Sequence, residues 1–288
     1  MKLEGVLVPL VTPFKDGKVD LVSYEKLIKT YSEKGVAGFM PLATTGETPT
    51  LSDYEYESIL DKTLEANKLN LPIYVGFGGN NTEKMTKDIK KLEKYNIQGI
   101  LSVCPYYNRP DQRGIYEHFK RISESTSLDI VLYNIPYRTG RNIENDTIRK
   151  LSELKNIVGI KDACGDFNQT TELLLNRPED FSILTGEDAF FYSTLMLGGD
   201  GGIMASAHLN TEKYVEVYNK AKQNDHEGAF KLWKEVVDII PMLFKEPNPS
   251  PIKYCLHKLG VIKSDDVRLP LVSISKELSI TLDKFISL

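Results

Sequence analysis

The chain has 288 residues, of which 41% are hydrophobic and 26% charged, so it has enough apolar length for a large folded core. Its 36 basic and 40 acidic residues leave a net charge of −4, which argues against a general nucleic-acid binder. No run approaches the roughly 18 consecutive apolar residues of a membrane span, and Glu4 and Pro9 interrupt the segment that a signal peptide would need. Three scattered cysteines predict reduced thiols and a cytoplasmic location, and four histidines without ligand spacing argue against a metal site.

Eight short apolar runs, each with the length and composition of a buried strand, follow one another along the chain. They span residues 5–11, 38–42, 71–75, 100–103, 129–133, 156–163, 181–184 and 201–205. Helical patterns separate most of them; after the first run, for example, Tyr24, Leu27, Ile28 and Tyr31 recur on one helical face. Ser52 or Asp53 is expected to cap the helix after the second run, and Thr82 to begin the helix after the third.

The ends of these predicted strands lie 20 to 33 residues apart. Eight strand-helix units of this size fit a (β/α)8 TIM barrel of about 250 residues. A doubly wound sheet is the alternative, but it has fewer strands and a phosphate-binding turn after the first. The sequence therefore predicts an α/β barrel over residues 1–224.

The remaining residues, 225–288, predict a C-terminal helical extension. Apolar residues fall at helical spacing in two groups: Phe230, Trp233, Val237, Ile240, and then Ile252, Cys255, Leu256, Leu259. The proline-rich stretch at 247–251 is expected to form a rigid hinge before the second helix.

Catalytic groups of such barrels lie at the carboxyl ends of the strands. At these ends the chain carries one amine, several hydroxyls and one guanidinium: Lys161, Thr44, Thr45, Tyr106, Tyr107, Tyr133 and Arg138. Burial disfavours the charged form of a lysine, so its free amine is available at neutral pH and can attack a ketone to form a Schiff base. Nearby hydroxyls can transfer the protons, so the set suits imine chemistry on a keto acid.

Each candidate also has a structural interpretation. Lys161 could be an exposed residue at a strand edge, and Arg138 an ordinary surface arginine. Residues 44–47 could be only a loop that leads into a helix, with the negative charge of Glu47 placed favourably near the positive end of the helix dipole. The functional alternative is a turn whose backbone N–H groups and hydroxyls bind a carboxylate. Tyr106 and Tyr107 could be packing aromatics. The glycine-rich stretches at 76–79 and 198–202 lack a dinucleotide pattern and are interpreted as turns.

Four segments together resemble the dihydrodipicolinate synthase / N-acetylneuraminate lyase family. They are Ala-Thr-Thr-Gly-Glu at 43–47, Pro-Tyr-Tyr-Asn at 105–108, Tyr-Asn-Ile-Pro at 133–136 and Gly-Ile-Lys-Asp at 159–162. Their order and spacing match the family over nearly the whole chain, as do residues 247–251 and 266–270. Arg138 follows the third motif by two residues, as in the synthase branch of the family, whereas the sialic-acid lyases lack this arginine.

The resemblance implies a lyase of the diaminopimelate and lysine pathway that condenses pyruvate with L-aspartate 4-semialdehyde. Lys161 would form the pyruvate Schiff base. Tyr133, Thr44 and Tyr107 would relay protons, with Tyr107 supplied by a neighbouring subunit of a homotetramer. No organic cofactor or metal is implied, since the imine itself serves as the electron sink.

The resemblance also implies the substrate contacts. Thr45 and its backbone would hold the pyruvate carboxylate, and Arg138 the carboxylate of aspartate semialdehyde. Gly186 and Ile203 would contribute backbone near the lysine. Two hypotheses stay open beside the synthase: another pyruvate-dependent aldolase or lyase, for sialic acid or a 2-keto-3-deoxy sugar acid, and a non-catalytic metabolite-binding barrel.

Two departures from the family pattern matter. Ala43 replaces the glycine that usually opens the threonine turn, a change we expect to be tolerated. Many synthases of the family bind lysine as a feedback inhibitor in a second site. At the corresponding positions this chain retains Asn80 and Tyr106, but Asp53, Tyr56 and Lys84 differ from the usual residues. Because Lys84 would repel the ammonium group of lysine, the sequence predicts weak or absent inhibition.

Overall fold

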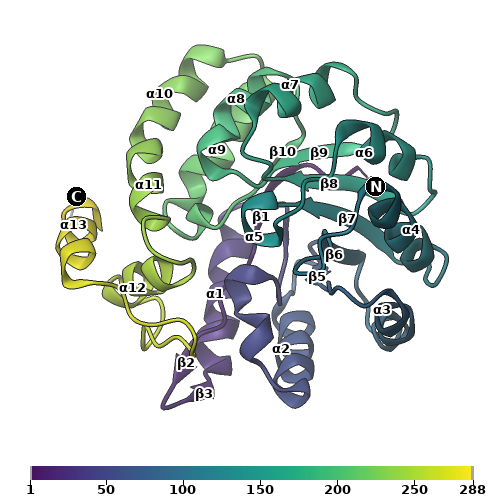
Figure 1. Cartoon of the computed structure of the whole chain (residues 1–288). Coiled ribbons are helices and arrows are strands. Elements are labelled where there is room, and N and C mark those ends of the chain that lie inside the picture. Colours follow the sequence, from purple (N-terminus) through teal and green to yellow (C-terminus); the bar gives the residue numbers. More distant parts are fainter. Residues whose placement is uncertain (1, 287–288) are drawn as a thin grey trace. The chain divides into compact units, whose positions relative to one another are not determined.

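The computed structural model describes residues 2–286, which divide into two compact units (Figure 1). The first unit joins residues 72–203 with the N-terminal residues up to Gly5. The second unit comprises residues 6–71 and the chain from Met204 onward.

Six parallel strands form the sheet of the first unit, in the order β10-β9-β8-β7-β6-β5. They are β5 (Tyr74–Gly76), β6 (Gly99–Val103), β7 (Asp129–Asn134), β8 (Ile157–Asp162), β9 (Ser182–Thr185) and β10 (Gly201–Ile203). All six coincide with predicted apolar runs. The strand with the lysine, β8, pairs with β7 on one side and β9 on the other, so it lies inside the sheet. An interior strand is buried on both faces, which explains its nearly continuous apolar sequence.

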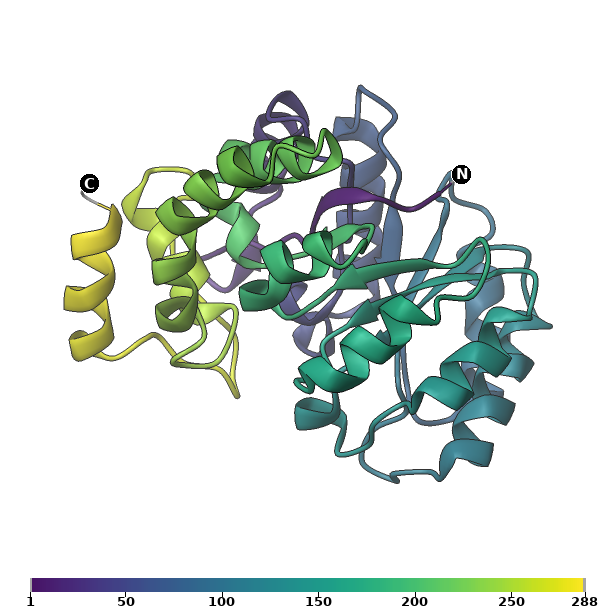
Figure 2. The ribbon, with the colours of Figure 1, turned by 90° about the horizontal axis from the view of Figure 1, so that it is seen from above.

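A layer of helices covers this sheet, as Figures 1 and 2 show. Within the layer α3 packs on α4, α4 on α6 and α6 on α7. The helices of the unit are α3 (Thr82–Asp88), α4 (Gln112–Ser123), α5 (Pro136–Thr139), α6 (Asn145–Ser152), α7 (Phe167–Leu175) and α8 (Phe191–Met196). Side chains of Asn81, Asp111 and Asp166 accept backbone N–H bonds at three of the helix starts. Thr82 begins α3 as predicted.

The second unit contains the first two predicted strands and the C-terminal helices. Strands β1 (Gly5–Val8) and β4 (Gly38–Phe39) are parallel, and β2 (Phe14–Lys15) forms a hairpin with β3 (Lys18–Val19). The helices are α1 (Leu21–Glu33), α2 (Asp53–Ala66), α9 (Thr211–Lys222), α10 (His226–Val236), α11 (Ile240–Leu243), α12 (Ser250–Lys258) and α13 (Lys276–Ile286). Ser52 caps α2 in a reciprocal capping box with Glu55, so of the two predicted caps Ser52 is correct.

Two expectations about the C-terminal helices were partly wrong. Phe230 is 47% exposed, because the buried face of α10 is formed by Ala229, Trp233 and Val236. Leu259 follows the end of α12 and is also exposed, whereas the other three residues of its predicted face are buried. Among the described residues, no helix is both long and apolar enough to cross a membrane.

Candidate active site

Lys161 lies near the carboxyl end of β8 and is only 6% exposed. It is the register partner of Tyr133 on β7, and its Nζ atom lies 4.4 Å from the centre of the Tyr133 ring. The interpretation of Lys161 as an exposed edge residue was therefore wrong, since the side chain is buried in an interior strand.

Burial lowers the pKa of Lys161 to about 8, because an ammonium loses its hydration in the sheet. The carboxylates of Asp188 and Glu187 raise this pKa, and the Arg138 guanidinium lowers it. At pH 7 a lysine with this pKa is a free amine in about one tenth of the molecules, against fewer than one in a thousand for an ordinary lysine. The amine is thus available as a nucleophile.

Gly186 follows β9 and lies directly against the lysine side chain. A Cβ atom at this position would lie 2.6 Å from Lys161 Cγ and 2.7 Å from Cε. The Gly186 amide donates to the Asp162 carbonyl at 2.6 Å, which fixes the backbone in this close approach. Ile203 ends β10 and is fully buried, at the same edge of the parallel sheet as Lys161.

Arg138 is exposed on the short helix α5, which directly follows β7. Thr139 fixes this helix, because its hydroxyl donates to the carbonyls of Ile135 and Arg141. Asn134 anchors the following chain by accepting from the Ile143 amide at 3.0 Å. These bonds fix the backbone from which Arg138 extends, and a guanidinium has two parallel N–H donors that suit a carboxylate.

Tyr107 points away from the core of its own unit and is 90% exposed. Its backbone adopts a positive φ of 70°, which is unusual for a bulky residue and is a feature of functional loops. Hydrogen bonds from Asn80 to the Tyr106 carbonyl and from Asn108 to the Asn80 carbonyl hold the loop. The interpretation of Tyr107 as a packing aromatic of its own chain was wrong.

The threonine turn belongs to the second unit, where Thr44–Gly46 form a 3-10 turn. Thr45 is buried and accepts a hydrogen bond from Asn248 Nδ2 at 3.0 Å. Glu47 ends the turn and accepts from Lys253 Nζ at 2.6 Å. Glu47 is therefore a buried pairing residue, and the interpretation that it favours a helix dipole was wrong.

Sequence reasoning missed three residues around these groups. The Asp162 carboxylate accepts hydrogen bonds from Thr170 Oγ1 at 2.6 Å and from the Cys164 amide, and these bonds fix the backbone that follows Lys161. Burial raises the pKa of Asp162. Asn248 and Lys253 were also missed, since they lie more than 200 positions from their partners in the turn. The available signal was the position of Lys253 in α12, three residues before Leu256 and therefore on the side of the helix that is buried.

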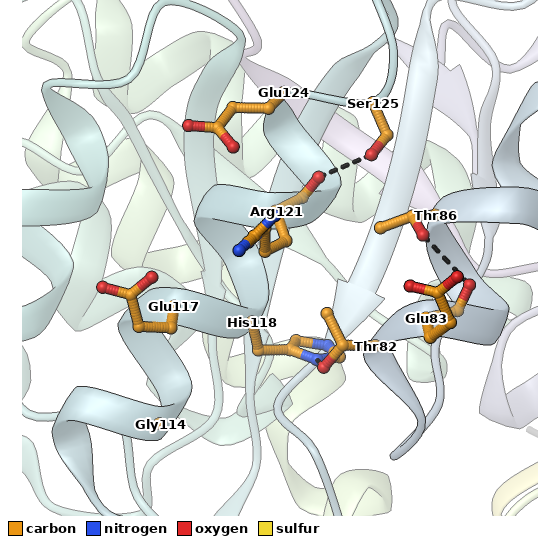
Figure 3. Close-up of a pocket in the computed structure, with 9 residues that line it drawn as sticks. All are labelled: Thr82, Glu83, Thr86, Gly114, Glu117, His118, Arg121, Glu124 and Ser125. Carbon is orange, nitrogen blue, oxygen red and sulfur yellow. Dashed lines mark hydrogen bonds between the residues drawn. The ribbon is translucent and has the colours of Figure 1, made fainter.

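A separate cavity of about 640 Å³ lies between α3 and α4 (Figure 3). Its lining includes Glu83, Glu117, Arg121 and His118, whose Nδ1 pairs with Thr82 Oγ1 at 2.8 Å. Burial lowers the pKa of His118 to about 4, so the ring is neutral at pH 7. No predicted site residue lines this cavity, so it is not the place for the imine chemistry.

Comparisons with known proteins agree with this geometry. Residues 2–288 match the Dihydrodipicolinate synthetase family. The chain is 82% identical to 4-hydroxy-tetrahydrodipicolinate synthase 2 of Clostridium acetobutylicum over 286 residues, 99% of this chain and all of the relative. It is 40% identical to the 4-hydroxy-tetrahydrodipicolinate synthase of Thermotoga maritima, over 95% of this chain and 94% of that one.

Two solved structures show the same fold. The crystal structure of dihydrodipicolinate synthase from Thermotoga maritima has a TM-score of 0.96 and 37% identity, covering 100% of this chain and 98% of that chain. A monomeric dihydrodipicolinate synthase variant has a TM-score of 0.95 and 38% identity, covering 99% and 97%. The protein is thus a lyase with a (β/α)8 barrel fold, which excludes the doubly wound sheet. More particularly, the chain belongs to the dihydrodipicolinate synthetase family.

Proposed function

We infer that this chain condenses pyruvate with L-aspartate 4-semialdehyde to give 4-hydroxy-tetrahydrodipicolinate, a step of diaminopimelate and lysine biosynthesis. The observation that carries this inference is the buried amine of Lys161 with its lowered pKa, at a carboxyl strand end. The activity is the one named in two relatives, which match 99% and 95% of this chain.

The reaction follows from the chemistry of a free amine. Lys161 attacks the keto carbon of pyruvate, and loss of one water leaves a protonated imine. The imine draws electrons from the methyl carbon, which loses a proton, and the resulting enamine adds to the aldehyde. The amino group of the second substrate then attacks the imine carbon, closes the ring and releases Lys161. Every electron pair comes from the substrates or the lysine, so no organic cofactor or metal is required.

The other site residues take supporting roles in this proposal. Tyr133, Thr44 and Tyr107 transfer protons between the carbinolamine, the imine and the aldehyde oxygen. Thr45 and its backbone hold the pyruvate carboxylate, and Arg138 holds that of the semialdehyde. The backbone at Gly186 and Ile203 lines the space beside the imine.

Borohydride trapping tests the central step. The protein is incubated with pyruvate, reduced and digested, and the added mass is located by mass spectrometry. We expect the label on Lys161 alone and none in a Lys161→Arg variant, which keeps a cation of similar length. An unlabelled wild-type protein would exclude every imine mechanism and favour a non-catalytic barrel.

Arg138 separates the synthase from other pyruvate-dependent aldolases. In Arg138→Ala we expect pyruvate labelling of Lys161 to persist while turnover with aspartate semialdehyde falls by about a hundredfold or more, because a charge-assisted pair is lost. Near-normal turnover with the semialdehyde would favour a different aldehyde substrate.

We further propose a homotetramer in the cytoplasm, in which Tyr107 acts in the site of a neighbouring subunit. The exposure of Tyr107 on a held loop supports this. Mixing Tyr107→Phe subunits with Lys161→Ala subunits tests it, since hybrids would contain some intact sites. Activity that returns on mixing supports the proposal that Tyr107 of one subunit acts in the site of another. If hybrid oligomers form and remain inactive, the proposal is wrong.

A further inference from the structure

A buried ion pair joins the threonine turn to the C-terminal segment within the second unit. Lys253 Nζ lies 2.6 Å from Glu47 Oε1, and both side chains are fully inaccessible to solvent. Lys253 also donates to the Asp266 carbonyl at 2.6 Å, and the Arg268 amide donates to Glu47 Oε2 at 3.0 Å. Both ions are thus paired and additionally hydrogen-bonded.

Such a pair is not explained by stability alone. A buried ion pair seldom contributes more than well-packed apolar side chains would, because both ions lose their hydration. The pair does, however, fix the position of Glu47, and with it the end of the threonine turn, relative to α12. Glu47 adopts a positive φ of 54° at the end of the turn, a conformation that a non-glycine residue keeps only when its surroundings hold it.

A hydrogen bond from Asn248 also holds the same turn. Its Nδ2 donates to Thr45 Oγ1, while Thr12 Oγ1 donates to the Gly46 carbonyl at 2.8 Å. Because the hydroxyl oxygen of Thr45 already accepts a bond, its hydrogen remains available to donate to a ligand oxygen. Asn248 is only 7% exposed, so water does not compete freely for this contact.

A second ion pair, between Arg268 and Glu55, fixes residues 266–268, whose backbone contacts the Lys253–Glu47 pair. The Arg268 guanidinium binds both oxygens of Glu55 at 2.6 and 2.8 Å, and donates to the Gly17 and Thr50 carbonyls. These bonds hold the pKa of Glu55 down at about 2. The carbonyl of Asp266 and the amide of Arg268, which contact the Lys253–Glu47 pair, are thereby held in place.

We propose that Asn248 and Lys253 are positioning residues for the keto-acid substrate. They hold the Thr44–Glu47 turn so that Thr45 donates its hydrogen to the substrate carboxylate, which makes the predicted C-terminal extension part of the binding apparatus. This inference rests on the proposed function, in which Thr45 binds pyruvate. It assigns to two residues that touch no substrate a measurable effect on pyruvate binding.

The test measures the pyruvate concentration that half-saturates Lys161 labelling, together with kcat and both KM values. In Asn248→Ala, and in Lys253→Met combined with Glu47→Gln, we expect the half-saturating pyruvate concentration to rise roughly tenfold, as for loss of one well-oriented hydrogen bond. The KM for the semialdehyde should change less than twofold. Tyr254→Phe is the matched control, since it removes a 2.8 Å bond to Asp283 from the same helix without touching the turn.

The outcomes are distinguishable. A merely structural role would lower the melting temperature and the active fraction but leave pyruvate saturation of the folded fraction unchanged, and that result would overturn the proposal. If the double variant fails to fold, Asn248→Ala alone decides, because it leaves the ion pair intact. Failure of the proposed function appears separately, as wild-type protein that pyruvate and borohydride do not label.

Discussion

Tyr133 and Lys161 occupy matched positions on neighbouring parallel strands, and the ammonium nitrogen of Lys161 lies 4.4 Å from the centre of the Tyr133 ring. Backbone pairing of the two strands therefore holds the ring and the amine against each other. The face of the ring stabilises the charged lysine, and the proton transfer proposed for Tyr133 falls to its hydroxyl.

This arrangement predicts a separation between the two functions of Tyr133. Tyr133→Phe keeps the ring beside the amine and removes only the hydroxyl, so we expect kcat to fall by roughly a hundredfold to ten-thousandfold with little change in melting temperature. Tyr133→Leu should also lose thermal stability, since the aromatic contact disappears. Steady-state kinetics and thermal unfolding check both; wild-type kcat in the phenylalanine variant would contradict a proton-transfer role.

The pKa of Lys161 predicts how the reaction depends on pH. Only the free amine attacks pyruvate, so the rate of imine formation should rise with pH, roughly tenfold per unit well below pH 8, and level off above a midpoint near 8. Rapid-mixing mass spectrometry measures this rate. Asp188→Asn serves as the control: the Asp188 carboxylate raises the pKa, so the variant's midpoint should move to lower pH. A midpoint above pH 10 in the wild type would exclude a desolvated amine.

The close approach of Gly186 to the lysine predicts a steric effect. A methyl group there would lie within 2.7 Å of two Lys161 carbons, so Gly186→Ala should displace the amine and lower the labelling rate by about tenfold or more, with a loss of about 1–3 kcal/mol in stability. Gly79→Ala is a suitable control, because its nearest neighbour would be Met85 Sδ at 3.4 Å, an ordinary contact. Equal labelling rates in the two variants would contradict the prediction.

The surroundings of Lys84 predict the response to lysine. Its side chain is 76% exposed and lies 3.7 Å from Asp88. If this chain had the inhibitor site that the family resemblance implies, the cation of Lys84 would repel the ammonium group of bound lysine. In steady-state assays we expect lysine at about 1 mM to leave this enzyme nearly uninhibited, and Lys84→Glu to increase inhibition. Submillimolar inhibition of the wild type would refute this.

The barrel strands were predictable because each leaves a local signal. An apolar run of strand length bounded by polar residues reflects burial on both faces, and its periodic recurrence reflects the repeated strand-helix unit. The position of Lys161 at the end of the sixth run followed from counting. Phe230 was misplaced because a short amphipathic pattern admits two neighbouring helical faces, and only packing against the rest of the unit selects one.

The sequence by itself determined the order of the strands, the placement of the reactive lysine at a strand end and, through four motifs, the family. Only the tertiary structure decided which groups surround those residues. Lys253 and Asn248 meet their partners Glu47 and Thr45 across more than 200 positions, and Gly186 meets Lys161 between neighbouring strands. The physical reason is that strand and helix patterns arise from backbone bonding and burial within a few residues, whereas these contacts arise from packing between distant segments.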